Sequence, residues 1–187
     1  MICVSSKTQG LLLQSIPYLG KKKILKVFTR EYGLLSFFSI KEEITPFLLA
    51  EWVFQKSQKE LLPLKEITII QPFSHLKESY KVLRSAGLMA KRILETQAPD
   101  KSAEKLFDLT LFYFKNLSLS PAQIVASFHI KLLLYEGLFS EEKDPLFSEE
   151  EWDLVCLLGF SKSLSAIQNI SAIPYDKIQS LFEKRLL

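Results

Sequence analysis

The sequence predicts an α+β protein in which an amino-terminal five-stranded β-barrel is followed by an all-helical bundle. The first third of the chain consists of short apolar runs separated by turns, and no helix-length periodic segment interrupts them. After Pro72 the apolar residues recur at three- and four-residue steps, which is the spacing of a helix face. We therefore expect a strand domain over residues 1–73 and a helical domain over residues 74–187.

Each candidate strand is a short apolar or alternating run bounded by turn residues. The five runs are Gly10–Ile16, Lys23–Thr29, Leu34–Ile40, Pro46–Gln55 and Glu66–Gln71. Tyr18–Gly20 and Arg30–Gly33 are predicted reversals, the second with Gly33 free to take a positive φ. The charged stretch Lys56–Glu60 and Pro63 separate the last two runs. Five short strands with such turns are typical of a small sandwich or a partly open barrel.

The helical part begins with a face made of residues at helical spacing, namely Leu76, Tyr80, Leu83, Gly87, Ala90 and Leu94. Ser74 is the predicted cap of this helix, and Gln97–Pro99 ends it. A second helix follows from Asp100 or Ser102 to Leu117.

Three further helices are predicted from their start signals. Ser120 and Pro121 have the composition of an N-cap and a first helical position. Ser148–Glu151 matches a capping box, in which a serine hydroxyl and a glutamate satisfy the first backbone amides of a helix. Pro174–Leu187 forms a last amphipathic helix. We expect five or six helices in one bundle.

Charge is unevenly distributed along the chain. The net charge is +3, but residues 1–73 hold ten Lys or Arg against six Asp or Glu, whereas the remainder holds fourteen against fifteen. Six cations precede the first acid, Glu31; they are Lys7, Lys21, Lys22, Lys23, Lys26 and Arg30. A locally positive surface attracts polyanions, and aromatic rings near the cations can stack on bases. The alternative is that the lysines form a solvated turn without a ligand and that the aromatic residues belong to the hydrophobic core.

Several classes of function lack their sequence signals. The two cysteines, Cys3 and Cys156, form no CxxC pair, so no structural zinc or zinc finger is expected. His75 and His129 have no acid or cysteine at metal-ligand spacing, and the common catalytic and phosphate-loop motifs are missing. We therefore expect neither an enzyme nor a cofactor. No apolar run reaches membrane-spanning length, and no leader is recognised, so a cytoplasmic protein is expected.

A basic and apolar surface is predicted on the first helix. It consists of Lys81, Arg84, Leu88, Lys91 and Arg92. Such a groove can receive an acidic peptide that ends in an aromatic residue and a carboxylate. An ordinary solvated helix face over core residues is the alternative.

Four segments, taken in order, resemble the RecO family of recombination mediators. Thr8–Leu13 resembles the family's opening strand, and Lys23–Gly33 resembles its next strand with a Phe-Thr-x-x-x-Gly turn. Glu66–Leu83 looks like the junction between barrel and bundle, and Phe128–Phe139 resembles a helix that ends in a glycine turn. The resemblance spans most of residues 8–139.

This resemblance implies an amino-terminal oligonucleotide-binding (OB) fold, favoured over an SH3-like barrel, and a helical carboxy-terminal domain. It implies binding of single- and double-stranded DNA, strand annealing and help in loading recombinase. It also implies two protein partners, RecR and the acidic C-terminal tail of the single-stranded DNA-binding protein, and a nucleoid-associated location. The family's DNA contacts map onto Lys21, Lys22, Lys23, Lys26 and Arg30.

Two segments depart from the family pattern. Many relatives carry a basic segment after the third strand, where this chain has Ser39–Glu43. Many also carry four cysteines after the third helix, where Ser140–Phe147 has none. The leading hypothesis is a non-enzymatic DNA-repair mediator. The alternative is a protein-interaction adaptor whose barrel has lost its affinity for nucleic acid.

Overall fold

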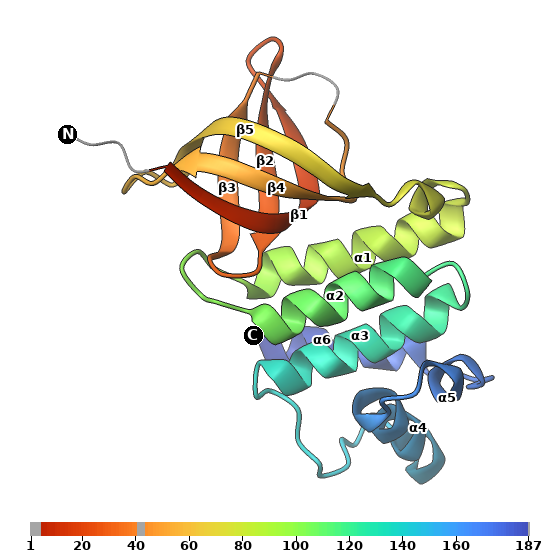
Figure 1. The fold of residues 1–187 in the computed structure, drawn as a ribbon. Coiled ribbons are helices and arrows are strands. Elements are labelled where there is room, and N and C mark those ends of the chain that lie inside the picture. Colours follow the sequence, from red (N-terminus) through yellow and green to blue (C-terminus); the bar gives the residue numbers. More distant parts are fainter. Residues whose placement is uncertain (1–4, 41–43, 187) are drawn as a thin grey trace. The chain divides into compact units, whose positions relative to one another are not determined.

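The amino-terminal strands close into a barrel (Figure 1). The computed structural model describes residues 5–40 and 44–186, so Cys3 and the Lys41–Glu43 part of the departing segment lie outside the described residues. The strands are β1 (Ser5–Tyr18), β2 (Lys22–Thr29), β3 (Gly33–Ser39), β4 (Leu48–Gln55) and β5 (Leu61–Pro72). Their order around the ring is β1-β2-β3-β5-β4, and only the β3–β5 pair is parallel. The predicted fold class is confirmed.

The barrel core comes from the inward residues of alternating strands. Leu25 and Val27 of β2 face inward and oppose the inward side of β3, on which Phe37 lies. The Phe37 and Trp52 rings stack with centroids 5.6 Å apart. Trp52 Nε1 donates to the Gly10 carbonyl at 2.9 Å, so this buried indole has a partner. Gly10 is needed there because a Cβ would lie 2.5 Å from a Val27 methyl.

Two strands are longer than predicted. β1 begins at Ser5 rather than Gly10, and β5 begins at Leu61 rather than Glu66. The prediction placed Pro63 between strands, and that was wrong. Pro63 aligns with Phe38 in the parallel pair, whereas the described pairing of β5 with β4 begins only at Leu64. A proline is tolerated there because no ladder hydrogen bond to β4 needs its missing N–H.

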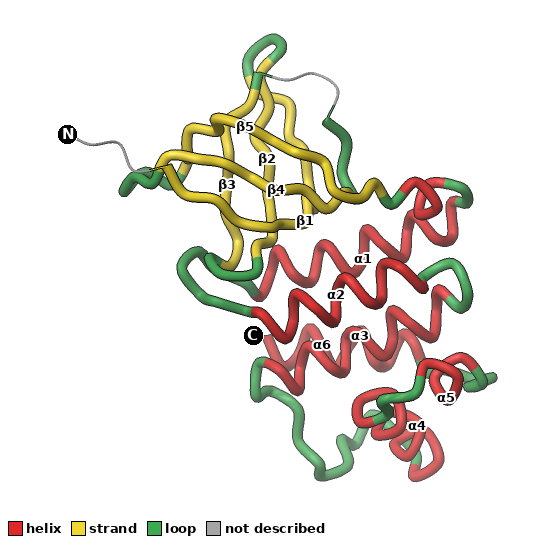
Figure 2. Tube along the Cα trace, viewed as in Figure 1, coloured by secondary structure: helices red, strands yellow, loops and turns green. Residues whose placement is uncertain are grey.

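The described residues after the barrel form helices joined by loops (Figure 2). The described elements are the 3₁₀ helix η1 (Ser74–Lys77) and the helices α1 (Tyr80–Thr96), α2 (Glu104–Asn116), α3 (Pro121–Tyr135), α4 (Glu149–Phe160), α5 (Leu164–Gln168) and α6 (Tyr175–Leu186). The predicted capping box is confirmed, since the Ser148 side chain accepts from Glu151 N and the Glu151 side chain accepts from Ser148 N.

The predicted start of the first helix and part of its face were wrong. Ser74 lies in η1, and the helix α1 is capped instead by Ser79, whose Oγ accepts from Val82 N at 3.2 Å. Tyr80 is 80% exposed, although its spacing predicted a buried position. The stripe that α1 buries is made of Val82, Ala86, Met89, Ala90 and Ile93. The buried stripe is displaced by one position from the predicted one and shares only Ala90 with it.

The chain forms two compact units. One contains the described residues up to Glu78 together with Ala90–Leu109, and the other contains Ser79–Met89 and the described residues from Thr110 onward. In the first unit the segment after α1 is bound to the β2–β3 turn. Leu34 N donates to the Ala98 carbonyl and Asp100 N donates to the Tyr32 carbonyl. A division after Phe73 stays a prediction, and the packing adds Ala90–Leu109 to the unit that holds the barrel.

In the second unit α3 packs against α4, α5 and α6. Tyr113 Oη and Ser127 Oγ are 2.8 Å apart, and Ser127 Oγ donates to the Leu158 carbonyl of α4. Lys131 Nζ donates to the carbonyls of Gly159 and Ser161, which closes the end of α4. Burial lowers the pKa of Lys131.

Candidate nucleic-acid interface

The β1–β2 turn presents three consecutive lysines, Lys21, Lys22 and Lys23, here called the cationic turn. Leu19 and Gly20 both take positive φ, and Lys22 N approaches the Leu19 carbonyl at 3.5 Å, which makes a tight reversal. Lys21 and Lys22 are exposed, and Lys23 is half-buried. Lys23 lies between Pro17 of β1 and Ser39 of β3 in the ladder.

Aromatic rings lie beside the cationic turn. Tyr18 is 44% exposed and contacts Phe38 edge-to-face, with ring centroids 6.3 Å apart. Lys22 Nζ lies 5.6 Å from the centroid of the Phe38 ring. A hollow of about 290 Å³ adjoins Phe38 and is lined further by Ser39, Ile40 and Leu64–Ile67. Positive charge and partly exposed rings therefore come together at this end of the β1–β2 hairpin.

Lys26 lies on the same outer side of the hairpin. It is half-buried, and its Nζ donates to Ser36 Oγ of β3 at 2.8 Å. Its charge meets a neutral hydroxyl there rather than a carboxylate. Lys22 and Lys26, four positions apart, share the outer side of β2, and Lys21 and Lys23 flank Lys22 at the turn end of the strand.

The other two predicted cations lie at the opposite end of the hairpin and are paired with acids. Lys7 Nζ lies 2.7 Å from a Glu51 carboxylate oxygen. Arg30 pairs with Asp108 of α2, and its guanidinium carbon lies 5.9 Å from the Phe107 ring centroid. The hydrogen bond and charge of Asp108 raise the pKa of Arg30.

The stretch that lacks acids in the sequence is therefore not free of acids in space, which corrects that expectation. Asp108 is 78 positions from Arg30, so no local pattern predicts the pair. Lys7 and Arg30 also share a hollow with the carboxylates of Glu31 and Glu51.

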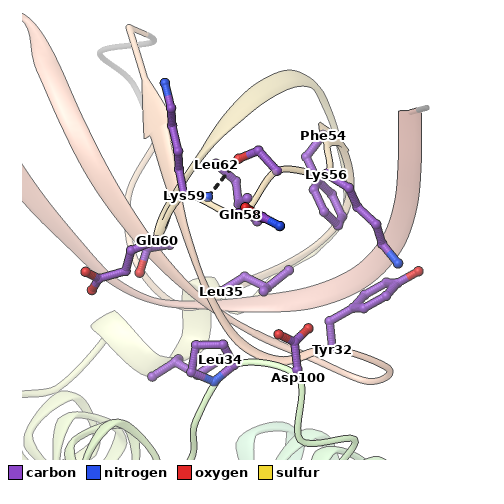
Figure 3. Close-up of a pocket in the computed structure, with 13 residues that line it drawn as sticks. Tyr32, Leu34, Leu35, Phe54, Lys56, Gln58, Lys59, Glu60, Leu62 and Asp100 are labelled. Atoms are coloured by element: carbon purple, nitrogen blue, oxygen red, sulfur yellow. Dashed lines mark hydrogen bonds between the residues drawn. The ribbon is translucent and has the colours of Figure 1, made fainter. Parts of the chain in front are cut away.

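A second cavity, here called the wall cavity, was missed by sequence reasoning (Figure 3). It has a volume of about 320 Å³ and is walled by Tyr32, by the start of β3, by the β4–β5 loop and by Pro99 and Asp100. Lys56 Nζ lies 4.5 Å from the Tyr32 ring centroid. The lining comes from distant segments, so the only sequence signal is the pair of lysines, Lys56 and Lys59, in the β4–β5 loop.

The predicted peptide groove is only partly assembled. Lys81, Arg84 and Leu88 line a cavity of about 150 Å³, together with Ser85, Ala122, Val125 and Tyr175. Lys91 and Arg92 do not line it. Arg92 is 2% exposed and lies 2.8 Å from a Glu95 oxygen, so its inclusion in an exposed groove is corrected.

The two histidines lie against aromatic rings, and the described cysteine, Cys156, is half-buried. The His129 ring is buried near the rings of Tyr175 and Phe182, with centroids 6.1 and 5.4 Å away. His75 lies 6.0 Å from the Phe73 ring. Burial, with Asp153 and Glu141, raises the pKa of Cys156. Within residues 5–40 and 44–186, no three potential metal ligands gather at one point. In that part of the chain no helix has the length and apolar character to cross a membrane.

Comparison with known proteins identifies relatives along nearly the whole chain. No protein-family model matches. The chain is 30% identical to the DNA repair protein RecO of Chlamydia trachomatis serovar D, with 95% of this chain and 90% of that protein covered. It is 27% identical to RecO of Chlamydia muridarum, over 95% of this chain and 94% of the relative. A match to RecO of Chlamydia pneumoniae, at 30% identity, spans 73% of this chain but only 57% of that protein. The chain therefore belongs to the RecO family of DNA repair proteins.

Proposed function

We propose that this protein is a non-enzymatic mediator of DNA repair and recombination that binds single- and double-stranded DNA through its barrel. The observation that supports this most is the cationic turn beside the Tyr18–Phe38 ring pair. Proteins that bind single strands combine cations for phosphates with rings for bases. Duplex DNA would be held by the same cations through its backbone alone.

Strand annealing follows from the same arrangement. Lysines that neutralise phosphates reduce the repulsion between two complementary strands. Bound strands can then pair wherever their base edges stay accessible. In this proposal the protein works at the nucleoid and brings strands together without a chemical step.

The second unit is proposed to hold the protein partners, RecR and the acidic C-terminal tail of the single-stranded DNA-binding protein. The cavity lined by Lys81, Arg84 and Leu88 offers two cations at the edge of an apolar floor. An acidic tail with an aromatic end matches that combination. Engagement of the tail would bring the barrel to coated strands and so help to load recombinase.

The experiment is a fluorescence anisotropy titration with a labelled single strand at several salt concentrations, repeated with the acidic tail peptide. If Lys21, Lys22, Lys23 and Lys26 each displace counterions from a single strand, the log–log salt slope is about −2.8, roughly a fifty-fold loss of affinity between about 50 and 200 mM salt. Reversing Lys21, Lys22 and Lys23 to Glu should make the slope shallower by about 2.1, the share of three phosphate contacts.

A matched control carries Lys105→Glu, Lys115→Glu and Lys162→Glu. These exposed lysines lie outside the barrel, and both triple variants take the net charge from +3 to −3. The control should keep most of the wild-type slope. Equal losses in the two variants would mean that net charge rather than the cationic turn governs binding, and the site assignment would be abandoned.

The second candidate function is a protein-interaction adaptor whose barrel has lost affinity for nucleic acid. The observation in its favour is that Lys7 and Arg30 are each paired with a carboxylate. The same titration separates the two functions. The adaptor binds the tail peptide but gives no salt-dependent signal with DNA.

A further inference from the structure

The wall cavity lies where the barrel wall is incomplete. β3 and β5 pair only from Ser36 opposite Leu61 to Phe38 opposite Pro63, so the first residues of β3 have no β5 partner in the described ladder. The β4–β5 loop passes over this gap. Leu35, Phe54 and Leu62, which belong to the barrel core, also line the cavity. The cavity is therefore an opening in the wall with an apolar floor made by the core itself.

Polar groups surround that floor. Gln58 contributes an amide, Ser36 a hydroxyl and Asp100 a carboxylate, while Lys56 supplies a cation above the Tyr32 ring. Figure 3 shows Lys56 and Tyr32 close together at one side, whereas the side chains of Lys59 and Glu60 extend away from the other labelled residues. An amide both donates and accepts hydrogen bonds, as the edges of nucleobases do. A cation beside an aromatic ring and an apolar floor is the combination that can bind a phosphate next to a base.

The cavity is formed before any ligand arrives. Its far wall, Pro99 and Asp100, is fixed to the β2–β3 turn because Asp100 N donates to the Tyr32 carbonyl at 3.0 Å. Leu34 N donates to the Ala98 carbonyl at 3.1 Å, one residue before that wall. A volume of about 320 Å³ lies at the small end of ligand cavities, which suits one small molecule rather than a peptide.

The cavity also adjoins the proposed DNA interface. Ser36 lines the wall cavity and accepts from Lys26, and Phe38, two residues further along β3, carries the ring beside the cationic turn. Residues two apart on a strand lie on the same face, about 7 Å from each other. A strand held at the cationic turn can therefore continue into the cavity.

We propose that the wall cavity holds a single nucleotide, with its base over Leu35, Phe54 and Leu62 and its phosphate at Lys56. This inference rests on the proposed function for its place on the DNA path. The nucleotide is either one unit of the bound strand or a free mononucleotide, because both present the same base and phosphate. A base inserted here leaves the stack and is held by the protein alone.

The test uses the full chain labelled with ¹⁵N and two probes, a 12-nucleotide oligodeoxythymidylate and thymidine 5′-monophosphate. Each probe should shift the backbone amide resonances of Ser57–Glu60 and Asp100. Lys56→Glu should abolish the shifts caused by the monophosphate and reduce the salt slope for the oligonucleotide by about 0.7, the share of one phosphate contact beyond those of the four lysines counted above. Gln58→Trp, which fills the cavity from an exposed loop position, should abolish the same shifts.

The matched control is Lys77→Glu, an equal charge reversal at an exposed residue of the same unit whose Nζ donates to Thr45. It should leave the loop shifts unchanged. If the oligonucleotide binds with its full salt slope but neither probe moves the loop amides, the inference is wrong and the proposed function stands.

The other outcomes test the DNA-binding function separately from the nucleotide site. If only the monophosphate moves the loop amides and the oligonucleotide does not bind, the cavity takes free nucleotide and the DNA function fails. Loop shifts with the oligonucleotide alone identify the strand as the source. The absence of any response to either probe overturns both proposals.

Discussion

At the scale of single residues, Gly33 combines two constraints. Its φ is +66°, and a Cβ would lie 2.3 Å from the Ala98 carbonyl oxygen and 2.6 Å from that of Lys101. The first constraint concerns the residue's own backbone, and the second concerns the segment bound against it. Sequence reasoning predicted the first from the turn composition. The second depends on a neighbour more than sixty positions away and had no local signal.

Gly33→Ala is therefore expected to destabilise the protein by more than the positive φ alone explains. The left-handed conformation costs about 1–2 kcal/mol for a residue with a Cβ, and displacement of the bound segment adds to it. Gly20→Ala is the control, because Gly20 has φ +67° but its Cβ would meet nothing within 4 Å. Urea unfolding of both variants measures the difference. Equal free energies of unfolding would show that the close approach is unimportant.

Asp144 is a residue whose charge matters through its neighbours. It is 3% exposed. Burial by itself raises the pKa of Asp144, but the Leu146 amide and the cations Lys184 and Arg185 outweigh it and hold that pKa below its ordinary value. The carboxylate thus joins the segment after α3 to the end of α6.

The sign of the pH dependence follows from the lowered pKa of Asp144 in the folded state. Its stabilising contribution is complete above the unfolded-state pKa of about 3.9 and is lost as the pH falls through the lower folded-state pKa. Asp144→Asn should therefore be less stable than wild type at neutral pH, with the gap narrowing toward pH 3. Urea titrations at several pH values test this. The control is Asp153→Asn, at an exposed position, whose free energy of unfolding should follow that of wild type across the pH range. A difference in the free energy of unfolding between Asp144→Asn and wild type that stays constant with pH would contradict the ion-pair account.

At the scale of elements, two serines offered the same sequence signal and behave differently. Ser148 accepts from Glu151 N at 3.2 Å and completes a capping box at the start of α4. Ser120 occupies the N-cap position of α3, but its hydroxyl donates to the Leu119 carbonyl and makes no cap bond. Ser120 was thus placed correctly in the chain, while its capping role was not confirmed.

Ser148→Ala should lower the free energy of unfolding by about 1 kcal/mol, the usual effect of losing an N-cap bond. Amide hydrogen exchange in the first turn of α4 should quicken as well. Ser120→Ala is the matched control and should change both quantities little. A similar decrease in the free energy of unfolding for both variants would mean that replacing any serine at a helix start has this effect, whether or not it makes a cap bond.

The presence of the strands and helices could be predicted from local sequence patterns. The ends of the strands and the buried face of α1 depend on tertiary packing. Polar residues open β1, and Pro63 lies inside β5, so both strands looked shorter than they are. On α1 two stripes fit the helical period, and only packing selects the one with Ala86 and Met89. The wall cavity was not predictable because its lining comes from segments that no short motif connects.

At the scale of the whole molecule, the order of barrel and helices was clear from the change of period after Pro72. The grouping of Ala90–Leu109 with the barrel unit was not, since it depends on contacts such as Phe28 with Phe107, whose ring centroids are 5.7 Å apart. The charged residues also divide into those that the sequence predicts and those that it does not. The cationic turn is visible in the sequence, while the pairing of Arg30 with Asp108 exists only in the folded unit.

The order of the ring has a consequence for how the chain is made. β5, the last strand to be synthesised, lies between β3 and β4, and β1 pairs with β4 from Ser5 opposite Gln55 to Leu12 opposite Leu48. Contacts so distant in sequence make folding slow. On the ribosome the nascent chain keeps unpaired strand edges until Pro72 has emerged from the exit tunnel. During that interval it is open to association with other chains.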